Sequence, residues 1–263
     1  MNLPVETWYA AIFERRSRRT FSSKPVESEK LERLQAVCRD FRPFPGARSE
    51  LVLGSPEPVF KGLVGRYGRV NGAPHYIAFI GNMDAPQAQE ATGYMGEGII
   101  LEATALGLGT CWVGGFFRPD AVRRDLTLSQ NERVLSITPV GYPVDQEDFS
   151  ERLLEGLAGS RRRKPLTDLV LEGSSTGWTG KAIEAARLAP SARNRQPWRF
   201  RVQDKYIVIS EDGKPSFSSI SRRLDCGIAM LHLELGARAA GKRGGWEFLN
   251  FPDVARFSPD SAR

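Results

Sequence analysis

Two segments far apart in the sequence carry the side chains best suited to hold a ligand. The first, at residues 15–19, reads RRSRR, and the second, at residues 189–198, reads APSARNRQPW. In the first segment Arg15, Ser17 and Arg19 recur at every second position, so their forked guanidinium donors and a hydroxyl can be presented together. That set of donors suits a phosphate group or an electron-rich carbonyl edge.

The second segment places short polar groups on a constrained backbone. Pro190 fixes the chain direction, while Ser191, Asn194 and Gln196 can hydrogen-bond the polar edge of a flat heterocycle. Trp198 can pack behind them. Neither segment is sufficient alone, but together they suggest a site for flavin mononucleotide (FMN).

The helices and strands that must position these segments form two similar series. Residues 101–109 (LEATALGLG) and 233–241 (LELGARAAG) share a helical apolar period that ends in glycine. A strand is expected after each of them, at residues 135–142 in the first series and at residues 246–251 in the second. The sequence therefore contains a degenerate internal repeat.

The correspondence continues upstream, where both series run in the order helix, loop, strand. The alternative is that any two stretches of mixed helix and strand look alike at this level of detail. The expected helices are residues 29–38 and 181–188, and the strands after them are residues 51–53 and 200–202. The apolar, β-rich runs expected at the centre of a sheet are residues 76–80 and 206–209.

These series predict an α+β fold made of two similar halves that pack against each other within one chain as a pseudo-dimer. The first half is expected to span residues 1–163 and to carry the arginine-rich segment. The second half, residues 164–263, carries the Pro-Ser-x-x-Asn segment. The basic stretch at residues 161–165 reads as an exposed connection between them.

Composition is that of a protein with a substantial core. The chain has 263 residues, of which 41% are hydrophobic, and this excludes a disordered chain. The formal net charge of +6 comes from scattered basic residues, with dense clusters only at residues 15–19 and 161–164. Because no DNA- or RNA-binding motif accompanies the charge, we expect no nucleic-acid partner. A basic structural or nucleic-acid-associated protein remains an alternative, which salt-dependent DNA binding without FMN binding would favour.

The cysteines and histidines give no sign of a metal site. Cys38, Cys111 and Cys226 are far apart in apolar surroundings, so buried thiols are expected rather than disulfides or metal ligands. His75 and His232 lack acidic or cysteine partners at ligand spacing and are expected to be structural. No segment has the length of a membrane span and no targeting signal opens the chain, so we expect a cytoplasmic protein without membrane association.

Three motifs together resemble the nitroreductase family of FMN-dependent oxidoreductases, and the resemblance covers most of the chain. They are residues 15–21 with Pro25 and Val26 behind them, residues 107–116 (GLGTCWVGGF), and residues 189–198. In dimers of this family each flavin site lies across the subunit interface. One subunit gives the arginine-rich motif and the other gives the Pro-Ser-x-x-Asn loop.

The chain departs from the family pattern in a complementary way. Residues 41–47 (FRPFPGA) stand where the first half should carry the Pro-Ser-x-x-Asn loop, and they lack its Ser, Asn and Gln. Residues 171–176 (LEGSST) stand where the second half should carry an arginine cluster. The resemblance therefore implies a fused pair with one surviving FMN site, and we expect a monomer.

The resemblance also implies a role for residues of each motif. Arg15, Arg161 and Arg163 are expected to contact the phosphate of FMN, and Arg19 the N1 and O2 edge of its ring. The further cofactor-binding residues implied by the motifs are Ser17, Gly114, Gly115, Pro190, Ser191 and Asn194.

Two of these roles have simple structural alternatives. Gly114 or Gly115 is expected to present a backbone N–H to flavin N5, because a residue without Cβ allows close approach, but a plain tight turn would also need glycine. The arginines can instead be solvated surface residues. The glycine-rich stretch at residues 61–73 either covers the site or is a passive insertion.

The activity implied by the resemblance is that of an NAD(P)H oxidoreductase. NAD(P)H passes hydride to flavin N5, leaves, and is replaced by a small electron-poor acceptor such as a nitroaromatic, a quinone or an enone. Hydride transfer itself needs no protein acid or base, so no catalytic side chain is expected. The alternative is a non-enzymatic FMN-binding or sensing protein derived from a nitroreductase.

Overall fold

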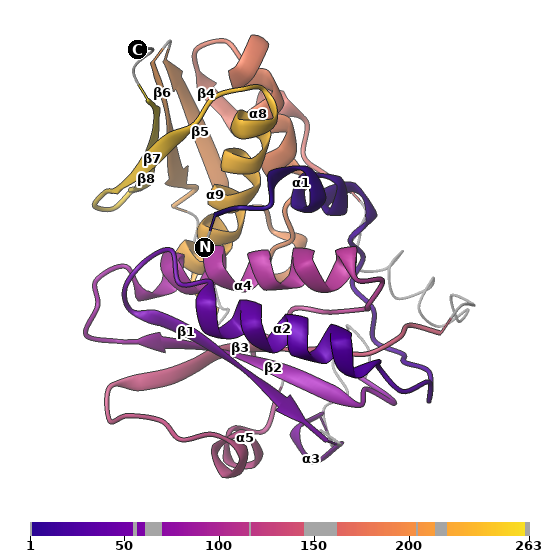
Figure 1. The fold of residues 1–263 in the computed structure, drawn as a ribbon. Helices are drawn as coiled ribbons and strands as arrows, with labels where there is room; N and C mark the ends of the chain where they lie inside the picture. Colours follow the sequence, from indigo (N-terminus) through magenta and orange to yellow (C-terminus); the bar gives the residue numbers. More distant parts are fainter. Residues whose placement is uncertain are drawn as a thin grey trace.

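The computed structural model describes residues 2–54, 57–60, 70–115, 117–144, 162–203, 205–213 and 220–260. These residues form a mixed fold with two separate sheets, one of three strands and one of five. Figure 1 shows the smaller sheet in the lower part of the view, the larger sheet in the upper part, and helices packed between and around them. The predicted α+β class is confirmed.

The smaller sheet is antiparallel, in the order β1 (Ala47–Leu53), β2 (His75–Asn82), β3 (Glu132–Val140). Its central strand β2 is buried from Tyr76 to Ile80, which confirms the prediction of a central strand at residues 76–80. Those residues are apolar without alternation because both faces of the sheet are covered. One face meets the main core and the other a smaller apolar cluster.

In Figure 1 the helices at residues 28–40 and 88–105 lie over the smaller sheet on the side of the larger sheet, and the short helices at residues 57–60 and 119–125 lie below it. The helix expected at residues 29–38 is present as α2, and its apolar residues are spaced to bury one stripe. In chain order the helices are α1 (Val5–Glu14), α2 (Ser28–Asp40), α3 (Glu57–Phe60), α4 (Ala88–Ala105) and α5 (Pro119–Asp125).

The larger sheet has the strand order β4-β5-β6-β8-β7, in which only the β4–β5 pair is parallel. The central position of β6 confirms the prediction for residues 206–209. Its strands are β4 (Val170–Glu172), β5 (Trp198–Gln203), β6 (Tyr206–Glu211), β7 (Gly244–Phe248) and β8 (Asp253–Pro259). The helices beside it are α7 (Leu166–Leu169), α8 (Gly177–Arg187), the 3-10 turn η1 (Ala192–Asn194) and α9 (Arg222–Ala239).

The end of the second half differs from the prediction. A strand at residues 246–251 was expected to close it, but β7 lies at the edge of the sheet and β8 inserts between β6 and β7. In β8 the buried residues Val254, Ala255 and Phe257 supply the apolar surface of an inner strand. The charged residues Asp253 and Arg256, with Pro252 before the strand, make it hard to recognise in the sequence.

Helices α4 and α9 are in direct backbone contact. A Cβ atom on Gly93 would lie 2.1 Å from the carbonyl oxygen of Leu224, and one on Gly227 would lie 2.1 Å from that of Glu90. Glycine at these two positions therefore lets the helices approach more closely than side chains would allow. Both helices are buried along most of their length because neighbours cover nearly all sides.

Several other expectations can be compared with the described residues. The three cysteines are buried and free, as predicted. The strands of the smaller sheet precede residue 163 and those of the larger sheet follow residue 164, while the division into two halves at that point stays a prediction. No helix in the described part of the chain is long and apolar enough to cross a bilayer.

Candidate functional site

The arginine-rich segment runs beside the glycine motif. Ser17 forms a parallel bridge with Thr110, and the backbone N–H of Arg18 donates to the carbonyl oxygen of Thr110 at 2.7 Å. On its other side the segment exchanges backbone hydrogen bonds with Asn71, which donates to Arg19 at 2.9 Å. Two of the three motifs are thus fixed side by side by main-chain bonds.

Arg15 is the most deeply buried side chain of this segment, with an exposed fraction of 8%. It follows the last turn of α1, where its N–H donates to the carbonyl oxygen of Ala11. Its Nε lies 3.8 Å from Oε1 of Glu97, and within the described part of the chain this buried nitrogen has no hydrogen-bond partner. Burial lowers the pKa of Arg15 and the Glu97 carboxyl opposes the change, but a guanidinium remains charged in proteins.

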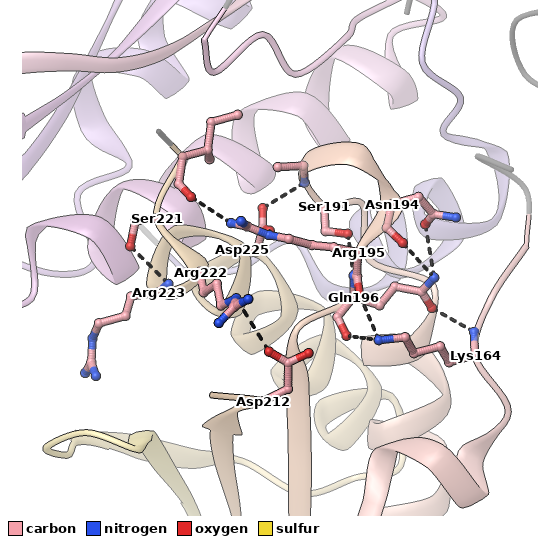
Figure 2. Close-up of polar contacts among 12 residues, drawn as sticks. Lys164, Ser191, Asn194, Arg195, Gln196, Asp212, Ser221, Arg222, Arg223 and Asp225 are labelled. Carbon is pink, nitrogen blue, oxygen red and sulfur yellow. Dashed lines mark hydrogen bonds and ion pairs between the residues drawn. The ribbon is translucent and has the colours of Figure 1, made fainter. Parts of the chain in front are cut away.

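The second segment forms a tight loop around η1 (Figure 2). The backbone is left-handed at three positions of the loop, with φ angles of 54° at Arg193, 53° at Asn194 and 48° at Gln196. Residues other than glycine rarely adopt this conformation. Two hydrogen bonds to Ser191 offset part of this strain. Its Oγ accepts from the backbone N–H of Gln196 at 2.9 Å, and its carbonyl oxygen accepts from the backbone N–H of Asn194 at 2.9 Å. Pro190, at the start of the loop, is buried.

Asp225, in the first turn of α9, anchors this loop from below (Figure 2). Its carboxylate accepts from the N–H of Ala192 at 3.0 Å and from Nε of Arg195 at 2.7 Å. Arg195 in turn donates to the carbonyl oxygen of Ile220 at 2.9 Å. The loop is therefore held against the N-terminal end of α9 by a buried ion pair.

Asp225 makes the stability of this part of the protein depend on pH. Burial raises the pKa of Asp225 from 3.8 to about 6, against the opposing effect of Arg195. Between about pH 4 and pH 6 Asp225 is therefore protonated in the folded protein and ionised in the unfolded chain. Protonation in this range stabilises the folded state, and the stabilisation is lost as the pH rises through 6. The variant Asp225→Asn cannot titrate, so the free energy of unfolding of the wild type minus that of the variant is expected to fall by up to about 3 kcal/mol across this range. Urea unfolding at both ends of the range measures it, and a difference independent of pH would contradict the assignment.

The segment after residue 161 packs onto the same loop. The backbone N–H of Lys164 donates to Oε1 of Gln196 at 2.8 Å, and its Nζ donates to the carbonyl oxygen of Arg195 at 2.8 Å. The prediction of an exposed connection is wrong for Arg163 and Lys164, which are half-buried, because these contacts draw them inward. Arg161, a predicted phosphate ligand, lies outside the described residues.

Arg163 packs against the second segment. Its Nη1 donates to Oδ1 of Asn194 at 3.2 Å and its Nη2 to the carbonyl oxygen of Leu188 at 3.1 Å. Burial, and after it the positive charges of Arg15, Arg187 and Arg16, lower the pKa of Arg163 to about 10. An anion bound near Arg163 would favour its charged form.

The side-chain amide of Asn194 is committed to contacts within the chain. Its Nδ2 donates to the carbonyl oxygen of Arg162 at 2.8 Å, and its Oδ1 accepts from Arg163 and from Gln196. Asn194 therefore positions Arg163 and the loop. Its predicted contact with a cofactor stays a prediction.

Gly114 meets the second segment through Ile220. A Cβ atom on Gly114 would lie 2.8 Å from Cδ1 of Ile220, whose carbonyl oxygen accepts from Arg195. A side chain at this position would require Ile220 to move, and the role of Gly114 toward flavin N5 stays a prediction. Gly115, next to it, is exposed.

The structure adds two residues that the sequence interpretation did not assign to the site, Glu97 and Asp225. Both are buried acidic residues in α4 and α9, helices that are themselves buried along most of their length. Carboxylates are seldom buried without a partner, so this pattern was the available signal. Within the described residues, no group of three or more histidine, cysteine, aspartate or glutamate side chains is placed to hold a metal ion.

This arrangement resembles known proteins at the levels of sequence and structure. A family model described as "Putative TM nitroreductase" matches residues 7–237. A protein of Archaeoglobus fulgidus named "Putative NADH dehydrogenase/NAD(P)H nitroreductase" is 40% identical over 58 residues, which are 21% of this chain and 33% of that protein. The match thus spans about a third of the curated relative. The crystal structure of a "putative nitroreductase" from Thermotoga maritima aligns with a TM-score of 0.65 and 22% identity over 96% of this chain and 93% of that chain, which shows a common fold.

Proposed function

The chain belongs to the nitroreductase family whose model matches most of its length, and we propose from this membership that it is an FMN-dependent NAD(P)H oxidoreductase. Bound FMN supplies the chemistry that carries hydride from NAD(P)H to a small electron-poor acceptor. The classes of acceptor that suit this chemistry are nitroaromatics, quinones and enones. The chain's own residues bind and orient the cofactor and its substrates.

The donor set supports a phosphate-bearing cofactor. Arg15 is a buried cation whose Nε has no hydrogen-bond partner among the described residues. A phosphate bound at this guanidinium group would satisfy the donor and balance its charge. This buried, unsatisfied donor of Arg15 is the observation that carries the proposal.

The other predicted contacts lie on the same two segments and on the glycine motif. Ser17 lies on the arginine-rich segment beside the glycine motif, and Ser191 lies on the loop that Asp225 anchors. We assign the polar edge of the flavin ring to Arg19 and the loop around Ser191, and close approach to the ring to the segment at Gly114 and Gly115. The protein would then supply orientation and charge, while no side chain is needed as a general acid or base.

We further propose that the chain is an internal pseudo-dimer, and two buried glutamates support this. Glu102 in α4 and Glu234 in α9 occupy matching positions of the sequence repeat. Glu102 accepts from the indole N–H of Trp8 at 2.6 Å, and Glu234 accepts from that of Trp246 at 2.7 Å. Each carboxylate also accepts from the Nε of an arginine, at 2.6 Å and 2.7 Å. Equivalent positions of the repeat thus accept hydrogen bonds from the same types of side chain, although the partners precede Glu102 and follow Glu234 in the sequence.

The counterpart of the FMN site is closed by aromatic side chains, which supports one FMN per chain. Phe44 lies in the loop that lacks the Ser, Asn and Gln of the family motif. Its ring packs edge-on against Tyr94 of α4 at a centroid distance of 5.0 Å and against Phe248 of β7 at 4.9 Å. These contacts fill the space between the two halves with packed apolar groups.

The proposed activity is tested by anaerobic reduction. Purified protein loaded with FMN is mixed with NADH or NADPH, and the flavin absorbance is followed before and after an acceptor such as a nitroaromatic or a quinone is added. The expected result is loss of the flavin colour faster than with free FMN, and its return on addition of the acceptor. A rate equal to that of free FMN would instead identify a protein that binds FMN without using it.

A further inference from the structure

A carboxylate and an imidazole form a fully buried pair directly behind Arg15. Glu97 in α4 and His232 in α9 both have an exposed fraction of 0%. Oε1 of Glu97 lies 2.8 Å from Nε2 of His232 and 3.8 Å from Nε of Arg15. The same oxygen therefore faces both a hydrogen-bond partner and the proposed phosphate-binding arginine.

The contacts of the pair determine where its protons lie. Nδ1 of His232 is 3.0 Å from the carbonyl oxygen of Ala185 in α8, and because that oxygen can only accept, Nδ1 carries a hydrogen. The contact at 2.8 Å between Nε2 and the Glu97 oxygen then requires one further proton, since two lone pairs would repel. The second oxygen of Glu97 accepts from Nε1 of Trp112 at 2.7 Å, which fixes the carboxyl group.

One shared proton makes the pair electrically neutral. An imidazolium beside a carboxylate and an imidazole beside a carboxylic acid have the same net charge of zero. Glu97 is therefore balanced by His232 rather than by Arg15, whose Nε is too distant for a hydrogen bond to it. The positive charge of Arg15 therefore stays available to an anion.

We propose that Glu97 and His232 are positioning residues that share one proton, and that they face Arg15 across 3.8 Å without neutralising it. The pair thereby preserves the preference of the site for a ligand with a phosphate group. This inference rests on the proposed FMN site for its functional part. The proton assignment rests on the contacts of His232 alone.

A double-mutant cycle on FMN affinity separates this role from simple packing. In His232→Gln an amide replaces the ring, so Glu97 becomes an unbalanced carboxylate that pairs with Arg15. FMN binding is expected to weaken by about tenfold or more, while binding of riboflavin, which has no phosphate, changes much less. Adding Glu97→Gln to this variant removes the negative charge and is expected to restore FMN affinity to within about threefold of the wild type. The matched control is His75→Gln, the other histidine of the chain, which is expected to change neither affinity.

The outcomes that overturn the inference are distinct. If the double variant binds FMN as weakly as His232→Gln or more weakly, the pair acts by packing and not by charge. Equal losses for FMN and riboflavin would also overturn the role toward phosphate.

A measurement without FMN keeps the proton assignment independent of the proposed function. The histidine side chains are labelled with nitrogen-15, and the resonances of His232 are identified by comparison with His75→Gln. We expect a protonated Nδ1 and an Nε2 that is protonated or strongly hydrogen-bonded. An Nε2 resonance typical of a free lone pair would overturn the inference, whereas a wild type that binds no FMN would overturn the proposed function while leaving this test intact.

Discussion

Replacing Arg15 with glutamine is expected to weaken FMN binding by about 100-fold. A charge-assisted hydrogen bond to phosphate contributes about 1.5–3 kcal/mol, which corresponds to a factor of about 10 to 150 in the dissociation constant, and Arg15 is buried, where solvent screens its charge little. The quenching of FMN fluorescence on binding measures the change. Riboflavin affinity is expected to fall much less, because riboflavin has no phosphate.

The neighbouring Arg16 provides a matched control for this variant. It is exposed, and its Nη1 donates to the carbonyl oxygens of Phe13 and Arg15, each at 2.9 Å. Arg16→Gln removes the same charge one residue away and is expected to change FMN affinity by no more than about threefold. Equal effects of the two variants would show that the site responds to overall charge and that Arg15 has no special role.

Replacing Gly227 with alanine is expected to destabilise the protein by about 3 kcal/mol or more. The new Cβ would lie 2.1 Å from the carbonyl oxygen of Glu90, so α4 and α9 would have to separate. Overpacking of this kind typically costs about 1–3 kcal/mol, and more where the backbone must move. Helix propensity alone predicts the opposite sign, because alanine is favoured over glycine in a helix by about 1 kcal/mol. The sign of the change therefore distinguishes the two effects.

Urea unfolding of Gly227→Ala and of Gly245→Ala provides the measurement and its control. Gly245 lies in β7, has no positive φ, and has no atom within 4 Å of an added Cβ. Its substitution is expected to change the free energy of unfolding by less than about 1 kcal/mol. A Gly227→Ala protein as stable as the wild type would mean that the two helices are not in the contact described.

The parts of the fold that could be predicted are those with a local signal. The runs at residues 76–80 and 206–209 are apolar and β-rich, and they form the central strands β2 and β6. The helical period at residues 29–38 corresponds to α2. Strand β8 was missed because its charged residues and the proline before it are not typical of an inner strand. Its partner β6 is distant in the sequence, and its partner β7 is reached through a turn.

In the functional site, too, residues within sequence motifs could be predicted, whereas contacts between distant residues could not. Residue types in the two ligand-binding segments pointed to Arg15 and Asn194, and the family resemblance pointed to Arg163, whose Nη1 donates to Oδ1 of Asn194. The contact between Glu97 and His232 joins residues 135 positions apart, and it exists because α4 and α9 cross at that point. No periodicity in the sequence encodes such a crossing.

The central claim is that a single chain builds one FMN site from its arginine-rich segment and the loop around Ser191. The most direct measurement is an anaerobic absorbance titration of the purified chain with FMN, which gives the number of FMN molecules bound per chain. One FMN per chain is the predicted result. Two would show that the aromatic cluster around Phe44 does not close the second site, and none would contradict the assignment of the site itself.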